Sequence, residues 1–157
     1  MKIAYRHLGV LVLDPTIAGV FGVDVSDRMI TLGQEWAASL ARDAPWVTPT
    51  LDKFLSSLVC QDMSLGIGQH VEAVKVADIV FMNNYLFSDT APGELTSLNG
   101  KMAKNLGQWL IKRHAVLVTT AMLSDDALLL AGNLDFPMGS FSWQTSDKWK
   151  GYIYTHK

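Results

Sequence analysis

Residues 92–123 constrain the fold most, because an amphipathic helical pattern there passes directly into a short apolar run rich in Val and Thr. Past the basic corner at 112–114, residues 115–123 are typical of a buried strand. Apolar residues recur upstream of that corner at helical spacing, namely at Leu95, Leu98, Met102, Leu106, Trp109 and Leu110. The stretch therefore predicts a helix that joins a helical half of the chain to a C-terminal half made of strands.

Upstream of this stretch the sequence predicts two strands and then two helices. Residues 3–13 and 17–25 are expected to form a hairpin around the turn at Asp14-Pro15-Thr16. A helix is expected from Ser26 or Asp27, either of which can cap it, to about Arg42. A second helix is expected over 48–61, with Thr48 as the N-cap and Pro49 as its first residue.

Residues 69–87 are compatible with two interpretations. Their length and the spacing of their apolar residues favour one buried helix, which is the structure that we expect. The β-branched residues favour the alternative, a strand over 70–76 followed by a short helix over 77–87. The alternative stays open at this point.

The C-terminal third predicts an antiparallel meander. Short apolar runs at 127–131, 141–144 and 152–155 follow the strand 115–123, with turn residues between them. A hairpin, a block of three to four helices and a meander together indicate an α+β fold. We expect one globular domain of two layers over residues 1–157.

Composition and charge narrow the classes of function. The chain is 49% hydrophobic and 18% charged, with a formal net charge of −2. A nonspecific nucleic-acid binder needs a surplus of Lys and Arg, so we expect no nucleic-acid partner. No apolar run is long enough to span a membrane and the N-terminus lacks the features of a signal peptide, so we expect a cytoplasmic protein without membrane contact. Cys60 is the only cysteine, which excludes an intrachain disulfide.

Three residues are candidates for acid–base chemistry: His70, Glu72 and His114. On a strand, His70 and Glu72 would share a face and could form a proton-transfer pair, whereas on a helix they would not. The H-x-E spacing occurs in zinc deaminases, but the P-C-x-x-C partner motif is absent. No other histidine has metal-ligand spacing, so we expect no metal site and no cofactor.

The aromatic C-terminus is the main candidate for a binding surface. Large aromatic residues are favoured at the energetic centres of interfaces, and Trp149 stands between two lysines. Cross-strand pairing within the sheet is the competing explanation for the cluster. The candidate binding residues are Trp143, Lys148, Trp149 and Tyr152.

These patterns favour a small binding or inhibitor-type protein that acts through contact with a protein partner or through self-association as a homo-oligomer. Two alternatives remain: a small enzyme with a His/Glu acid–base site between helices and sheet, and a pocket protein that sequesters a small apolar or aromatic ligand. Separately, Asn83 and Asn84 lie in an apolar run, where buried amides must be hydrogen-bonded. We expect their partners to lie within the protein.

Overall fold

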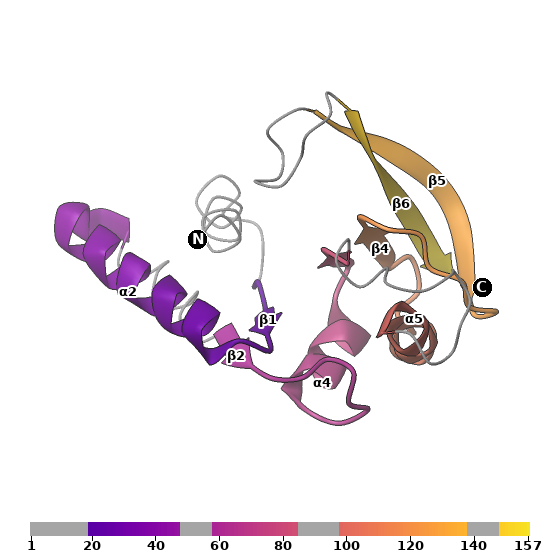
Figure 1. The fold of residues 1–157 in the computed structure, drawn as a ribbon, viewed down its shortest axis with the longest axis horizontal. Helices are drawn as coiled ribbons and strands as arrows, with labels where there is room; N and C mark the ends of the chain where they lie inside the picture. The colour runs from indigo at the N-terminus through magenta and orange to yellow at the C-terminus, as the bar shows by residue number, and fades with distance from the viewer. Residues whose placement is uncertain (1–18, 48–57, 85–97, 138–147) are drawn as a thin grey trace. The chain divides into compact units, whose positions relative to one another are not determined.

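The computed structural model describes residues 19–47, 58–84, 98–137 and 148–157 (Figure 1). These residues belong to two compact units, residues 1–63 and residues 64–157, and each unit is described by itself. Helices and strands occur in both, so the α+β class is confirmed. The organisation of the whole chain as one domain stays a prediction.

The first unit is built around helix α2 (Asp27–Asp43). Ser26 caps this helix as expected, because its Oγ accepts a hydrogen bond from the Met29 N–H at 3.4 Å. The helix ends where the Ala44 N–H bonds to the Leu40 carbonyl. The short 3-10 helix η1 (Pro45–Val47) follows.

Two short strands complete the described part of the first unit. Strand β1 (Gly22–Asp24) pairs in parallel with β2 (Leu58–Cys60). The predicted helix over 48–61 is therefore wrong at its C-terminal end, and its residues 48–57 lie outside the described residues. Three residues are too few to show strand alternation, and the pairing joins segments more than thirty residues apart. The predicted partner of residues 17–25, the strand at 3–13, also lies outside the described residues.

The second unit contains two helices and a four-stranded sheet. Its elements, in chain order, are α4 (Gln69–Val76), β3 (Ile79–Met82), α5 (Leu98–Trp109), β4 (Val116–Thr119), β5 (Leu128–Pro137) and β6 (Lys148–His156). Helix α5 and strand β4 confirm the predicted passage from helix to strand.

Residues 69–87 form neither of the two expected structures over their described part. The segment begins as a helix, α4, and continues as a strand, β3, which is the reverse of the alternative order. The helix ends at Ala77, whose backbone turns to the extended region. Strand β3 has only four residues, and its pairing with β4 across the intervening helix decides its structure. A local pattern cannot show that pairing.

The sheet has the strand order β3-β4-β6-β5. Strand β3 is parallel to β4, with α5 as the crossover between them, and β6 is antiparallel to both β4 and β5. The sheet is therefore mixed, and β6 lies between β4 and β5 rather than following them as in a meander. Strand β5 continues through Gly132 and Asn133, where a loop was expected, and β6 begins at Lys148 instead of Tyr152. The predicted strand 141–144 lies outside the described residues.

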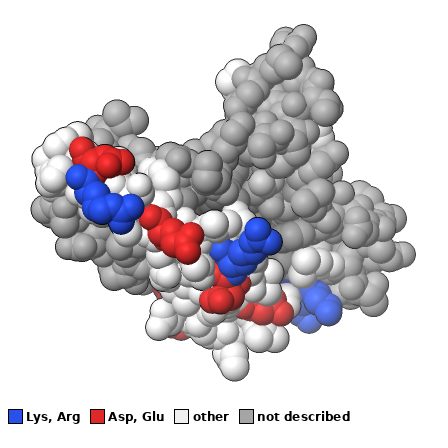
Figure 2. Space-filling view, turned by 60° about the vertical axis from the view of Figure 1, so that its left-hand side comes forward, with Lys and Arg blue, Asp and Glu red and all other residues white. Residues whose placement is uncertain are grey.

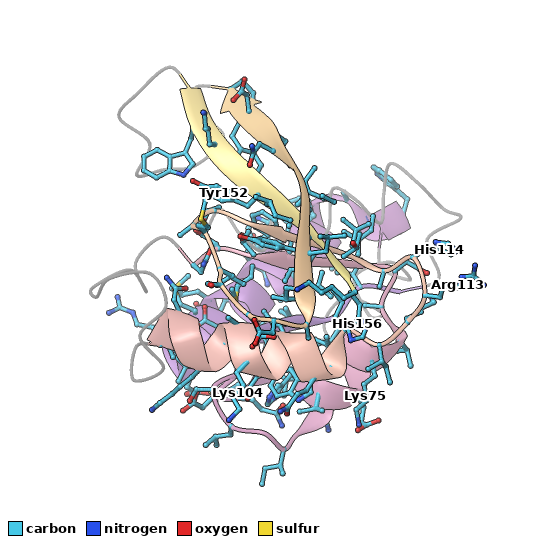
Figure 3. All side chains as sticks on the ribbon, turned by 90° about the vertical axis from the view of Figure 1, so that its right-hand side faces the viewer. Lys75, Lys104, Arg113, His114, Tyr152 and His156 are labelled. Carbon is cyan, nitrogen blue, oxygen red and sulfur yellow. The ribbon has the colours of Figure 1, made fainter. Side chains whose placement is uncertain are left out.

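The core of the second unit lies on one face of this sheet. The buried strand residues alternate, as Val80 and Met82 do on β3. Opposite them lie the buried residues of α4 and α5, two helices that contact each other. The stripe predicted for α5 is buried at Met102, Leu106, Trp109 and Leu110. Figure 3 shows α5 along this side of the sheet, with part of the β5–β6 hairpin extending beyond it.

Candidate functional site

His70 lies in the first turn of α4 and is 1% exposed. Its Nε2 atom lies 3.1 Å from the carbonyl oxygen of Leu65. Because a carbonyl only accepts, Nε2 carries the proton and donates it. The imidazole also stands edge-on to the Trp109 ring, with the centroids 5.4 Å apart. His70 is thus packed into the core by a backbone carbonyl and an aromatic ring.

Glu72 points away from His70. Two residues along a helix are separated by roughly 200° around its axis, so the two side chains lie on different sides of α4. The Glu72 side chain is exposed and forms an ion pair of 2.8 Å with Lys75, one turn along. Such an exposed pair contributes little to stability. The structure does not bring the predicted acid–base pair together.

His114 lies in the loop between α5 and β4, where its backbone φ is 69°. This left-handed conformation is uncommon for a residue other than glycine, and it turns the chain toward the sheet. The side chains of Arg113 and His114 stand side by side and exposed (Figure 3). Over the described ranges, no three His, Cys, Asp or Glu residues are grouped so that they could hold a metal ion.

The predicted aromatic binding residues do not share one surface. Trp149 pairs with Phe136 on β5, and Tyr152 pairs with both Thr119 and Asn133. Residues three apart on a strand point to opposite faces, so Trp149 and Tyr152 face opposite sides of β6. Lys148 is the first residue of β6, and Trp143 lies outside the described residues.

Tyr152 lies on the face that carries the core, as its neighbour Tyr154 does. The buried Tyr154 hydroxyl accepts a hydrogen bond from the Leu123 N–H at 2.8 Å and donates one to the Leu123 carbonyl at 3.1 Å. Burial raises the pKa of this phenol above its ordinary value of 10.0. Tyr154 therefore has a structural role.

Asn84 joins the carboxyl ends of the parallel strands β3 and β4. Its fully buried amide donates to the Asn99 Oδ1 atom at 2.8 Å and to the Ala121 carbonyl at 3.1 Å. Its Oδ1 atom accepts from the N–H groups of Thr120 at 3.0 Å and Ala121 at 2.8 Å. Asn83 accepts a further bond from the Thr120 hydroxyl at 3.0 Å. The prediction that these two amides are bonded within the protein is confirmed.

The other face of the sheet is apolar and uncharged. The register and the alternation of the strands place on it every second residue of each strand, with one shift at a bulge between Leu130 and Gly132. We call this the uncharged face. Its members are Ile79, Phe81, Val116, Val118, Leu129, Gly132, Leu134, Phe136, Trp149, Gly151, Ile153 and Thr155.

The sheet curls toward the uncharged face. Phe81 on β3 and Phe136 on β5 meet edge to face, with ring centroids 6.4 Å apart. Three strand spacings, about 14 Å, separate β3 from β5 in a flat sheet. The two rings can meet only if the outer strands bend toward each other, and Figure 1 shows the bend in β5 and β6. Phe136 and Leu134 also lie over Gly151, where a Cβ atom would come within 2.5 Å of the Phe136 ring.

Part of the uncharged face remains open to solvent. Ile79 is 71% exposed, Leu129 is 50% exposed and Phe81 is 45% exposed. A parallel strand pair is normally covered on both faces, so this exposure is unusual. In the view of Figure 2, by contrast, positive and negative side chains stand close together on the surface.

Sequence reasoning missed the uncharged face, although one signal was present. The runs at 79–82 and 116–118 are apolar at every position, which is typical of strands that are buried on both faces. Residues 69–87 were predicted as one helix because of their length, so the run at 79–82 was not predicted as a strand. The remaining members come from β5 and β6, whose register depends on the bulge.

Comparison with known protein families, with curated proteins and with solved structures finds no match for this chain. Across the part that the structure describes, no helix is long and apolar enough to cross a membrane. The assignment of a function therefore rests on the geometry of the second unit.

Proposed function

We propose that the protein is a protein-interaction module that binds its partner through the uncharged face of the β3–β6 sheet. The observation that carries this proposal is the exposure of Ile79, Leu129 and Phe81 on a face whose placed residues include none with a charge. Contiguous apolar surface of this kind typically marks an interaction site.

The chemistry of the face defines the chemistry of the partner. A charged group buried against it would lose its hydration and find no counter-charge, which costs several kcal/mol. The partner must therefore present an apolar, uncharged protein surface. The aromatic rings of Phe81, Phe136 and Trp149 are of the type that dominates the binding energy of interfaces.

The Asn84 network supports this role because it fixes β3, the strand that carries the exposed Ile79 and Phe81. It connects the end of β3 to the end of β4 and to Asn99 at the start of α5. A surface that is rigid before binding loses less conformational entropy when the complex forms. Trp149 adds to this order, since its Nε1 atom donates to the Thr120 carbonyl at 3.1 Å.

The test places one charge on the uncharged face. Ile79→Lys should abolish binding, because the ammonium group would be buried against an apolar partner, while the fold should persist because residue 79 is 71% exposed. Ile111→Lys is the matched control: Ile111 is 58% exposed, lies in the loop between α5 and β4, and is not a member of the uncharged face. Circular dichroism would verify that both variants keep the wild-type fold.

The measurement is quantitative affinity capture from a native lysate, with the wild type and both variants immobilised at equal density. We expect protein partners that are retained by the wild type and by Ile111→Lys and lost from Ile79→Lys. Equal retention by Ile79→Lys would refute the proposed surface. A wild-type chain that retains no protein and does not self-associate would refute the proposed function.

A further inference from the structure

Strands β5 and β6 continue beyond the end of β4. The last paired residue of β4, Thr119, lies opposite Tyr152, and Tyr152 lies opposite Asn133. Past this point, residues 134–137 and 148–151 pair with each other and, among the described residues, with no third strand. We call these two segments the strap. A two-stranded ribbon is only marginally stable by itself, so the position of the strap depends on what it touches.

The strap folds back over the uncharged face. Phe81 pairs with Val118 on β4, and the register carries this level across β6 to Gly132 on β5. Phe136 lies four residues further along β5 than Gly132. In a flat sheet the two phenylalanines would therefore be about 13 Å apart along the strands and about 14 Å apart across them. Their ring centroids are 6.4 Å apart, which requires the strap to bend back toward β3, and Figure 1 shows the bend of the two strands.

Two contacts connect the strap with the strands that it covers. Phe136 stands edge-on to Phe81, and the Trp149 Nε1 atom donates to the Thr120 carbonyl at 3.1 Å. Phe81 nevertheless remains 45% exposed, so the strap lies on its ring without sealing it from solvent. One aromatic contact and one hydrogen bond thus join a narrow ribbon to an apolar surface that stays partly open.

We infer that the strap is a movable cover that regulates access to the uncharged face. In the free chain it is closed, with Phe136 on the ring of Phe81. When it lifts, Phe81, Phe136 and Trp149 become accessible together. Ile79 and Leu129 are exposed while the strap is closed, and they give a partner its first contact. The inference rests on the proposed function, because it concerns the same face.

The strap sets how tightly the face binds. A partner that needs the three rings binds only the lifted form, so its affinity is reduced by the fraction of chains in which the strap is lifted. An aromatic contact and a hydrogen bond together favour the closed form by about five- to a hundredfold. The Asn84 network holds the ends of β3 and β4 in both forms, so the strands under the strap keep their order while the Trp149 bond is exchanged for the partner.

The test weakens the closed form without removing an aromatic ring from the face. Trp149→Phe loses the Nε1 donor and keeps a ring, and Trp46→Phe is the matched control, because Trp46 is 77% exposed in the first unit. The probe is Nile red, an uncharged apolar dye, titrated by fluorescence. We expect Trp149→Phe to bind the dye about fivefold more tightly than the wild type, because one hydrogen bond no longer holds the strap closed, and Trp46→Phe to match the wild type. Equal affinity for the dye in all three chains would overturn the inference.

A second measurement keeps the inference falsifiable if Trp149→Phe does not fold. NMR relaxation dispersion of the aromatic rings in the wild type reports exchange on the microsecond to millisecond scale. We expect one common exchange rate at Phe81, Phe136 and Trp149 and no exchange at Trp109, which is 5% exposed in the core. Rings of the strap and of Phe81 without exchange, or with unrelated rates, would overturn the inference. Ring exchange in a chain that captures no protein would refute the proposed function alone, and capture without ring exchange would refute the strap alone, so the two proposals fail separately.

Discussion

Replacement of Asn84 by alanine should destabilise the second unit strongly, because it removes at once the four hydrogen bonds that one buried amide makes with backbone groups and with Asn99. The Asn84 side chain is 0% exposed, and its amide donates two hydrogen bonds and accepts two from backbone N–H groups, with a longer contact of 3.4 Å from the Thr120 hydroxyl. At about 1 kcal/mol for each bond, with an added cost for every buried group left without a partner, the loss is about 3–5 kcal/mol. That is a large part of the 5–15 kcal/mol, roughly, that stabilises a typical domain.

Two partners of Asn84 keep a second hydrogen bond in the alanine variant, so the loss of unfolding free energy stays in this range. The Thr120 N–H keeps a bond of 3.3 Å to the Met82 carbonyl, and the Ala121 carbonyl keeps the Thr119 hydroxyl at 2.8 Å. Among the described residues, the Ala121 N–H donates to the Asn84 Oδ1 atom alone. Its desolvation is therefore the main penalty in the variant.

The assay is urea unfolding followed by circular dichroism, with Asn105→Ala as the matched control. Asn105 is partly buried and makes one hydrogen bond, from its Nδ2 to the Ser64 carbonyl at 3.1 Å, so its removal should cost about 1 kcal/mol. We expect the midpoint to fall several times further for Asn84→Ala than for the control. Equal shifts in the two variants would show that the amide does not hold the ends of β3 and β4 together.

Three further predictions follow from the second unit. Gly107→Ala should destabilise by about 1–3 kcal/mol, although alanine is the better helix former, because its Cβ would overlap the carboxylate of Asp125; a stabilised variant in thermal unfolding would contradict this contact. Gly151→Ala should displace the Phe136 ring from Phe81 and cost about 1–3 kcal/mol, which the ring chemical shifts and a thermal melt would measure. The pKa of Tyr154 is raised by burial, so its contribution to stability is complete below the ordinary value of 10.0 and declines as the pH rises above it. Tyr154→Phe should therefore remove a step above pH 10.0 from a tyrosinate absorbance titration, and an unchanged titration would refute the assignment.

Local patterns predicted the elements whose residues decide their own structure. Helix α2 begins after Ser26 because that residue supplies a cap, and α5 presents Met102 and Leu106 to the core because its apolar residues recur at helical spacing. The cap and the apolar spacing both depend on residues that lie within one or two helical turns of each other. The β-branched run after Arg113 was predicted as a strand for the same reason.

The elements that were mispredicted depend on distant partners. Strand β3 forms because Ile79 to Met82 align with Val116 to Thr119, and β2 forms because Leu58 to Cys60 align with β1. The amide of Asn84 meets groups that lie fifteen and more residues away along the chain.

The residues that make up the candidate surface also follow from the register of the strands, which a local pattern does not show. Trp149 and Tyr152 were predicted to share a binding surface, but the alternation of β6 places them on opposite faces of the sheet. The exposed Ile79 and Phe81 lie on β3, in a segment whose apolar spacing favoured a helix. Contacts across the sheet therefore decided both the surface and its members.

The most direct test of the proposed binding face is hydroxyl-radical footprinting of the chain, free and in complex with a captured partner. We expect that labelling of Ile79, Phe81 and Leu129 falls in the complex, while that of Ile111 stays constant. Unchanged labelling of the three face residues, with protection elsewhere on the chain, would contradict the proposed face.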